Sequence, residues 1–189
     1  GEGVVVVGPA PEAASRKTPP GAPVETIEKV GETTAGGPVG GICVSPDGKR
    51  LYAALWEDDK GSRVRCFTLP DLASSQTFTF APYHTHGDVV VSDDGRRIFT
   101  PNYYHNSISE IRLDVGGARK DLATVKPWPG SIAITPNRRM VLVPTGMDGR
   151  PHDMRNDGIA VYNVASGAFD GVAFIALRDE PRRQIALSP

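Results

Sequence analysis

Gly41-Ile42-Cys43-Val44-Ser45-Pro46-Asp47-Gly48-Lys49-Arg50-Leu51-Tyr52 is the stretch of sequence that decides the fold. It predicts a short apolar strand, a tight turn and a second strand. Pro46 presets the backbone of a type I turn, Asp47 can accept a hydrogen bond from its own backbone, and Gly48 suits the left-handed position that follows. The stretch therefore predicts two antiparallel strands joined by a tight turn.

This unit recurs along the chain. The second copy is Gly87-Asp88-Val89-Val90-Val91-Ser92-Asp93-Asp94-Gly95-Arg96-Arg97-Ile98-Phe99, the third is Gly130-Ser131-Ile132-Ala133-Ile134-Thr135-Pro136-Asn137-Arg138-Arg139-Met140-Val141, and a fourth opens at Arg183-Gln184-Ile185-Ala186-Leu187-Ser188-Pro189. Equivalent hydroxyl residues at positions 45, 92, 135 and 188 lie 47, 43 and 53 residues apart. A period of about 40–50 residues of strands and turns is typical of β-propellers, in which each period forms one four-stranded sheet, or blade. We therefore predict an all-β fold, a WD40-like β-propeller of four-stranded antiparallel blades.

The repeats divide this single propeller domain into three whole blades and two partial ones. We expect the outer strands of a partial blade with a Pro/Ala-rich loop in residues 1–35, whole blades in 36–81, 82–126 and 127–181, and the start of a further blade in 182–189. The expected strands of the whole blades cover residues 42–44, 50–55, 62–69 and 76–80, then 89–91, 97–100, 107–113 and 122–125, and finally 132–134, 140–143, 159–164 and 172–176. We expect the innermost strands to be buried on both faces and the outer strands to alternate between buried and exposed residues.

Two closures of the ring are compatible with this count. The chain can form part of a longer propeller, most often seven-bladed, which is our main prediction. In the alternative, the N-terminal outer strands and the C-terminal inner strand share one blade of a four-bladed ring, which would lack one strand. An open arc would leave apolar sheet faces uncovered, so the remaining blades of the same propeller are an expected partner.

Composition limits the function classes. The formal net charge is −1, with 21 basic and 22 acidic residues, whereas a nucleic-acid groove needs clustered positive charge. No apolar run approaches the ~20 residues of a membrane span. We therefore expect neither nucleic acid nor a membrane span, and a protein or small-molecule partner instead.

The two cysteines are expected to be free. Cys43 and Cys66 fall on the first and third strands of one predicted sheet. Their Cα atoms would be about 10 Å apart, which is too far for a disulfide. We expect two buried thiols, and the same distance disfavours a two-cysteine metal site.

The chain resembles a known group of repeat proteins. Gly36-Gly37-Pro38, followed by Ile42 to Ala53, is similar to the YVTN-type β-propeller repeat and to repeats of the seven-bladed lactonase family, which includes bacterial 6-phosphogluconolactonases. The resemblance covers most of residues 24–189. It implies a propeller, and it implies lactonase activity or, as in exported bacterial proteins with YVTN-type propellers, a binding or scaffold role. The latter favours an extracytoplasmic location, periplasmic or secreted.

The resemblance also suggests site residues. His84-Thr85-His86 is similar to a His-x-His that the lactonase family often carries before an inner strand. Trp128-Pro129-Gly130 stands where that family has Pro-Arg-His, and Pro101-Asn102 stands where it has an acidic residue. In a lactonase-like enzyme, His86 would act as a base or orient the ligand, with Asn102 and Arg182 nearby.

Imidazole and aromatic side chains are predicted to gather on one face of the propeller. One face collects the turns within the repeated unit, which carry small, charged or turn-forming residues. The other face collects the remaining loops, and loops on a rigid scaffold commonly carry binding residues. The ligand-binding candidates on this face are His84, His86, Tyr103, Tyr104, His105, Trp128 and His152.

No cofactor is indicated by a specific motif, although a divalent metal remains an alternative. Neutral imidazoles suit transition metals, and acidic loops offer the oxygen ligands of calcium. The metal-ligand candidates are His84, His86, His105, Asp148, Asp153 and Asp157. Ordinary loop residues bonded to the backbone would give the same pattern.

Three functions follow from these residues. The main prediction is a propeller module, more a binding protein or scaffold than an enzyme, whose histidine-bearing face binds a protein or small ligand. The alternatives are a lactonase-like hydrolase and a propeller subunit of a metal or redox enzyme. The absence of a Cys-x-x-Cys-His sequence argues against covalent haem in the last of these.

Overall fold

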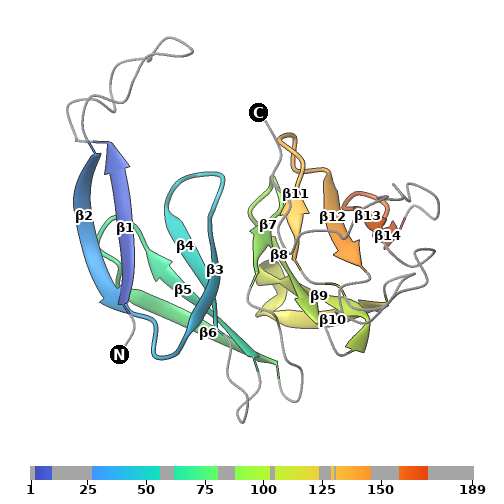
Figure 1. The fold of residues 1–189 in the computed structure, drawn as a ribbon, viewed down its shortest axis with the longest axis horizontal. Helices are drawn as coiled ribbons and strands as arrows, with labels where there is room; N and C mark the ends of the chain where they lie inside the picture. The colour runs from blue at the N-terminus through green and yellow to red at the C-terminus, as the bar shows by residue number, and fades with distance from the viewer. Residues whose placement is uncertain are drawn as a thin grey trace.

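The fold consists of antiparallel sheets. The computed structural model describes residues 3–9, 27–55, 62–80, 88–102, 105–123, 129, 131–145 and 158–169. Within these residues all regular elements are strands, apart from the short 3-10 helix η2 (Leu113–Val115). They form one two-stranded sheet and three four-stranded sheets (Figure 1). The predicted all-β architecture of four-stranded antiparallel blades is confirmed.

The strands of each sheet are neighbours in sequence as well as in space. The two-stranded sheet pairs β1 (Gly3–Pro9) with β2 (Ile27–Thr34). The first blade contains β3 (Val39–Val44), β4 (Arg50–Leu55), β5 (Ser62–Thr68) and β6 (Ser74–Phe80). The second blade contains β7 (Val90–Val91), β8 (Arg97–Asn102), β9 (Ser107–Arg112) and β10 (Ala118–Ala123). The third blade contains β11 (Ala133–Ile134), β12 (Met140–Thr145), β13 (Gly158–Asn163) and β14 (Ala168–Phe169).

Most of these strands lie where the sequence predicts them, and the outer strands differ most. β4 matches its expected range, whereas β10 begins four residues before its expected start at position 122. Gly116 and Gly117 both have positive φ, at 70° and 83°, so the chain reverses directly after η2. The fourth strand of the third blade is β14, and the segment expected there, 172–176, lies outside the described residues.

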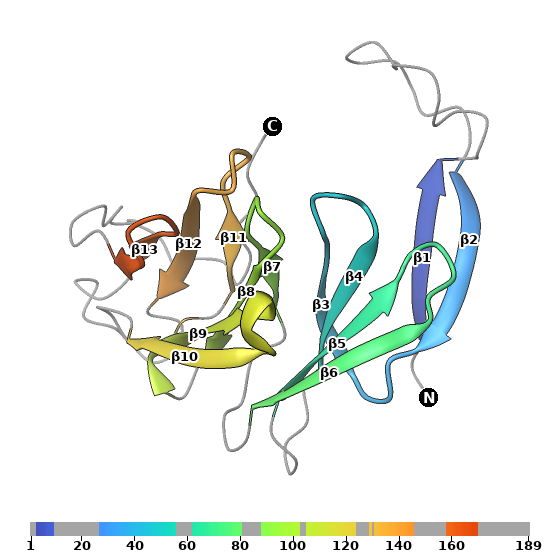
Figure 2. The same ribbon diagram turned by 180° about the vertical axis from the view of Figure 1, so that it is seen from behind.

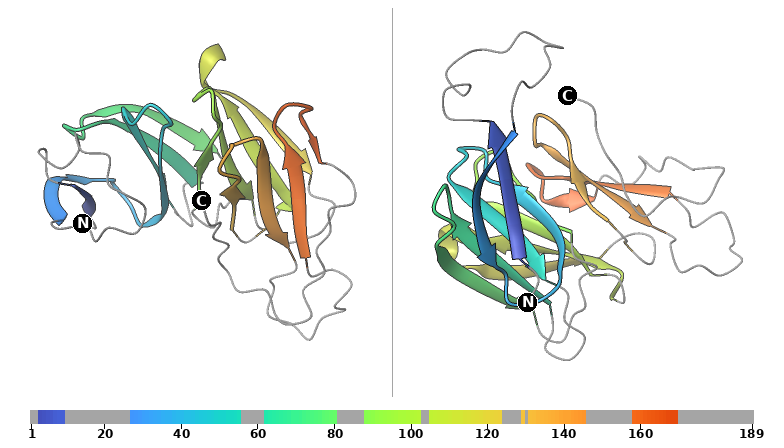
Figure 3. Two further views of the ribbon diagram at one scale, coloured as in Figure 1. Left: turned by 90° about the horizontal axis from the view of Figure 1, so that it is seen from above. Right: turned by 60° about the vertical axis from the view of Figure 1, so that its left-hand side comes forward.

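The sheets follow one another in an arc and pack face to face (Figures 2 and 3). We call the contact between the first and second blades the first junction and that between the second and third blades the second junction. Tyr52, Val64 and Cys66 of the first blade share a buried core with Ile98 and Ile111 of the second. Another buried core of ten residues, in which Phe99 and Tyr162 rings lie 5.6 Å apart, fills the second junction.

The turn between the first two strands of each blade is a repeated hydrogen-bonded unit. In the first blade, Ser45 N–H donates to the Arg50 carbonyl at 2.8 Å, and Ser45 Oγ donates to Asp47 Oδ1 at 2.6 Å. The same Asp47 oxygen accepts from Lys49 N–H at 3.0 Å. The hydroxyl and the carboxylate therefore fix both sides of the turn, which explains their spacing in the sequence.

The other two blades reproduce this unit. Ser92 Oγ donates to Asp94 Oδ1 at 2.5 Å, and Thr135 Oγ1 donates to Asn137 Oδ1 at 2.7 Å. The left-handed position predicted for Gly48 is confirmed, because its φ is 69°. The third turn places Arg138 at that position with a φ of 53°.

The expectation that every innermost strand is buried on both faces is wrong for β3. Val90 and Val91 of β7 are buried on both faces, whereas Ile42 and Val44 of β3 are 50% and 39% exposed. Within the described residues, the sheet packed on this side of the first blade consists of β1 and β2. Its contacts fall on the outer part of the blade, where Arg65 Nη1 donates to the Ala35 carbonyl at 2.6 Å.

Two other expectations about burial, for Cys43 and for the outer strands, also need correction. Both cysteines are free as predicted, but Cys43 is only half-buried, although it lies on the β3 face that packs against the core of the first junction. Outer strands were expected to alternate, yet β9 is buried at five of its six residues because blades lie on both of its faces. No helix in the described part of the chain is long and apolar enough to cross a membrane.

The repeated turn predicts a specific stability change for Gly48. A Cβ added there would meet nothing within 4 Å, so only the left-handed φ penalises a side chain. Gly48→Ala should lower the free energy of unfolding by about 1 kcal/mol, and Gly48→Asn by less, because asparagine tolerates this conformation. Urea unfolding of both variants checks this, and an equal loss in both would contradict it.

Candidate functional site

One candidate catalytic residue and one candidate ligand-binding residue lie in the described part of the chain. Asn102 ends β8 and is fully buried, whereas His105 is exposed in the turn before β9. The remaining candidates lie outside the described residues: His84, His86, Tyr103, Tyr104, Trp128, Asp148, His152, Asp153, Asp157 and Arg182. The described site is therefore built around Asn102, at the loop end of the second blade.

Asn102 is held by a polar chain that crosses three adjacent strands. Its Nδ2 donates to Ser107 Oγ at 3.0 Å and to Ser109 Oγ at 2.8 Å on β9. Ser109 Oγ donates in turn to Asp121 Oδ1 at 2.8 Å on β10. Asp121 forms a bidentate pair with Arg119, whose Nε donates at 2.8 Å. The chain fixes the carboxamide orientation from the outer edge of the blade inward.

Two buried polar atoms remain beside this chain without a partner among the described residues. They are Asn102 Oδ1 and Thr100 Oγ1. Thr100 and Asn102 are two positions apart on β8, so they share the face that packs against the first blade. A buried polar group without a hydrogen bond costs about 1–3 kcal/mol. Such groups are uncommon in proteins and are natural contacts for a ligand or a bound water.

Two more polar residues, Asp88 and Ser131, lie just before the inner strands of the second and third blades. Asp88 precedes β7, and its Oδ2 accepts from Ile132 N–H of the next blade at 3.1 Å. Burial raises the pKa of Asp88, although the backbone N–H groups of Ile132 and Val89 act in the opposite direction. Ser131 is buried, and its hydroxyl has no partner among the described residues. The next residue, Val89, packs in the core of the first junction, so the Asp88 carboxyl group faces the second junction, on the opposite side of the second blade from Thr100 and Asn102.

Sequence reasoning missed Thr100, Asp88 and Ser131. When the repeats are aligned on Ser45, Asp88 and Ser131 stand at the position that Gly41 occupies. That comparison signals a polar position before the inner strand. Thr100 gave no signal, because a threonine is ordinary in a strand and its unpaired hydroxyl is visible only in the structure.

The described residues contain no group of three or more His, Cys, Asp or Glu side chains that could hold a metal ion. Of the six metal-ligand candidates, only His105 belongs to them, so the predicted metal site is not tested. The polar loop end can accept and donate hydrogen bonds, and Asp88 can exchange a proton.

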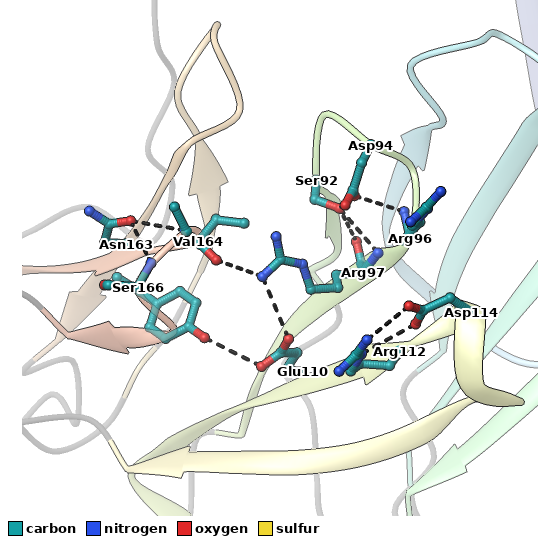
Figure 4. A network of polar contacts seen from close by, with 12 residues as sticks. Ser92, Asp94, Arg96, Arg97, Glu110, Arg112, Asp114, Asn163, Val164 and Ser166 are labelled. Carbon is teal, nitrogen blue, oxygen red and sulfur yellow. Dashed lines mark hydrogen bonds and ion pairs between the residues drawn. The ribbon is translucent and has the colours of Figure 1, made fainter.

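A second polar network ties the second and third blades together (Figure 4). Arg97 Nη1 donates to the Val164 carbonyl at 2.6 Å and lies 3.9 Å from Glu110 Oε1. The Tyr162 hydroxyl donates to Glu110 Oε2 at 3.3 Å. Glu110 is buried, so its charge is matched by a guanidinium and a phenol within the junction.

No family model and no curated protein matches the chain. Solved structures do match its fold. Hydrazine synthase of Kuenenia stuttgartiensis is 18% identical with a TM-score of 0.62, over 76% of this chain and 39% of that chain. A functionally unknown protein from Desulfotomaculum acetoxidans DSM 771 is 12% identical with a TM-score of 0.58, over 74% and 42%.

A third similar structure is a candidate 6-phosphogluconolactonase from Bacteroides uniformis ATCC 8492. It is 17% identical with a TM-score of 0.59, over 89% of this chain and 51% of that chain. At these identities the likeness shows the fold alone. The chain spans between 39% and 51% of the length of these three proteins.

The Glu110 network predicts how stability depends on pH. Burial, followed by the charge of Glu110, raises the pKa of Tyr162 from 10.0 to about 12. The unfolded chain releases this proton first, so stability should be complete below pH 10 and fall as the pH rises toward about 12. Urea unfolding at about pH 9 and 11 should show a smaller loss for Tyr162→Phe than for the wild type. Equal losses would contradict the raised pKa.

Proposed function

We propose that the chain is a β-propeller binding module that takes a small, hydroxyl-bearing ligand at the loop end of the first junction. One observation carries the proposal: Asn102 Oδ1 and Thr100 Oγ1 are buried on the same face of β8 and are unpaired among the described residues. The Asn102 oxygen can only accept a hydrogen bond, whereas the Thr100 hydroxyl can donate or accept. A ligand hydroxyl or amide group complements both.

The construction of the site supports a binding role. Ser107 and Ser109 orient the Asn102 carboxamide, and β8 and β9 belong to the blade that is packed on both faces. Binding groups on rigid strands keep their geometry better than groups on loops. A module of this type can present the ligand, or the loop face itself, to a protein partner.

Lactone hydrolysis is the second candidate function. The fold likeness to the candidate 6-phosphogluconolactonase and the raised pKa of Asp88 favour it. A protonated Asp88 could donate to a leaving oxygen, and its ionised form could accept a proton from water. The two functions differ in whether a sugar lactone is turned over.

Two ligands distinguish these functions. We expect δ-gluconolactam, which cannot be hydrolysed as a lactone ester, to bind saturably in calorimetry. We expect δ-gluconolactone to hydrolyse no faster with the protein than in buffer. Catalysed hydrolysis that Asp88→Asn abolishes would favour the enzyme, and absence of lactam binding would contradict the binding module.

Thr100→Val separates a ligand-binding hydroxyl from a structural one. Replacing an unpaired buried hydroxyl by a methyl group should raise the free energy of unfolding by about 1 kcal/mol while weakening lactam binding about tenfold. Thr68→Val is the matched control, because the Thr68 hydroxyl donates to Asp71 at 2.7 Å and its loss should be destabilising. Urea unfolding and calorimetry measure both effects. A destabilised Thr100→Val variant that binds normally would contradict the proposal.

A further inference from the structure

A polar cavity lies at the turn end of the first junction, opposite the loop end that holds Asn102. Its volume is about 250 Å³. The first blade contributes Asp47, Arg50 and Tyr52 to its walls, and the second blade contributes Asp93, Asp94 and Gly95. The cavity therefore opens between two successive copies of the repeated turn.

Two hydrogen-bond donors of β4 line this cavity, on the buried Tyr52 and on the exposed Arg50. Tyr52 is 1% exposed, and its hydroxyl has no hydrogen-bond partner among the described residues. Burial raises the pKa of Tyr52, so the phenol keeps its proton. The Arg50 guanidinium lies beside this hydroxyl, outside ordinary hydrogen-bond geometry, and contact with it raises the pKa of Arg50. A buried phenol and a guanidinium together favour an anionic oxygen.

The second junction shows what such a pair of donors can hold. There the Glu110 carboxylate lies 3.9 Å from Arg97 Nη1 (Figure 4). It also accepts a hydrogen bond from the Tyr162 hydroxyl. Arg97 is the repeat equivalent of Arg50, since each begins the second strand of its blade. The protein thus already pairs this arginine position with a phenol and a carboxylate.

The first junction has the donors but lacks a carboxylate at the position equivalent to Glu110. Glu110 is the β9 residue opposite Phe99, and the matching β5 residue opposite Tyr52 is Cys66. A thiol supplies no negative charge while it stays protonated. No salt bridge within the described residues involves Arg50. An external carboxylate could therefore take the role that Glu110 has in the second junction.

The two turns that line the cavity carry the opposite charge. Hydrogen bonds, led by that from Ser45, lower the pKa of Asp47, so its carboxylate is ionised. Burial opposes ionisation of Asp94, but hydrogen bonds from Ser92 Oγ and Arg96 N–H outweigh it, and its pKa is also lowered. With the exposed Asp93, three carboxylates face a single guanidinium in the cavity lining. These turn carboxylates favour a cationic group.

We propose that this cavity binds a small zwitterion, an amino acid that carries both a carboxylate and an ammonium group. The ligand carboxylate binds Arg50 and the Tyr52 hydroxyl, and its ammonium group binds the carboxylates of Asp93 and Asp94. A metal ion fits less well, since no described cluster of three acidic, His or Cys side chains could hold one. The β4 donors and the turn carboxylates match the two charged groups of an amino acid.

Calorimetry with ligands of graded length tests this assignment on the full chain. Glycine, β-alanine and 4-aminobutyrate place the two charges at increasing separation, and butyrate and butylamine carry one charge each. One of the three zwitterions should bind at least about tenfold more tightly than either single-charge compound. If no zwitterion binds saturably up to roughly 10 mM, or if butylamine binds as well as the best of them, the proposal is wrong.

Two matched variants locate the binding site. Tyr52→Phe keeps the ring and removes the unpaired hydroxyl, and it should weaken zwitterion binding about tenfold. Tyr162→Phe makes the same change in the second junction and should leave the affinity unchanged. Equal effects of the two variants, or unchanged binding by Tyr52→Phe, would overturn the proposal.

Cys66→Glu offers an independent test by filling the site from within. The new carboxylate would stand where Glu110 stands in the second junction, and it should abolish zwitterion binding. Retained binding in a folded Cys66→Glu variant would overturn the proposal, and Tyr52→Phe decides the question if that variant does not fold. The site proposed for δ-gluconolactam lies at the other end of the junction. A negative binding result at one site therefore does not contradict the proposal for the other.

Discussion

The structure depends on one constraint: each four-stranded sheet has to bury both of its faces against neighbouring sheets. The second blade meets this constraint, because Val90 and Val91 are buried on its innermost strand and β9 is buried along almost its whole length. The first blade meets it only in part. Its outer strands pack under β1 and β2, while Ile42 and Val44 of β3 are half-exposed. Position within the arc, more than local sequence, decides how deeply each strand is buried.

Burial on both faces also determines what a polar residue inside a junction can do. In the second junction, Glu110 is neutralised by Arg97 and bonded by Tyr162, so the polar groups stabilise the contact between blades. In the first junction, Asn102 at one end and Tyr52 at the other keep atoms that have no partner among the described residues. Unsatisfied buried groups are destabilising, and they are the places where a ligand can compensate the cost.

The repeat made the fold predictable, but it predicted much less of the candidate site. The Ser-Pro-Asp-Gly turn at Ser45 and its copies gave the strand order, because the hydroxyl and carboxylate act within six residues of chain. The exposure of Ile42 depends on how many strands precede it in space, which no local pattern encodes. Asn102 was identified by resemblance alone. Thr100, Asp88 and Tyr52 emerged only from contacts between strands and blades, and most predicted loop candidates lie outside the described residues.

Native-state hydrogen exchange tests most directly whether packing on both faces of a blade determines the local stability of its strands. Amide protons of β8 and β9 lie in the blade with neighbours on both sides, so they should exchange most slowly and close to the global unfolding limit. Amides of β3, whose outward face is open at Ile42 and Val44, should exchange measurably faster. Equal protection of β3, β8 and β9 would contradict the account, and so would slowest exchange in β3.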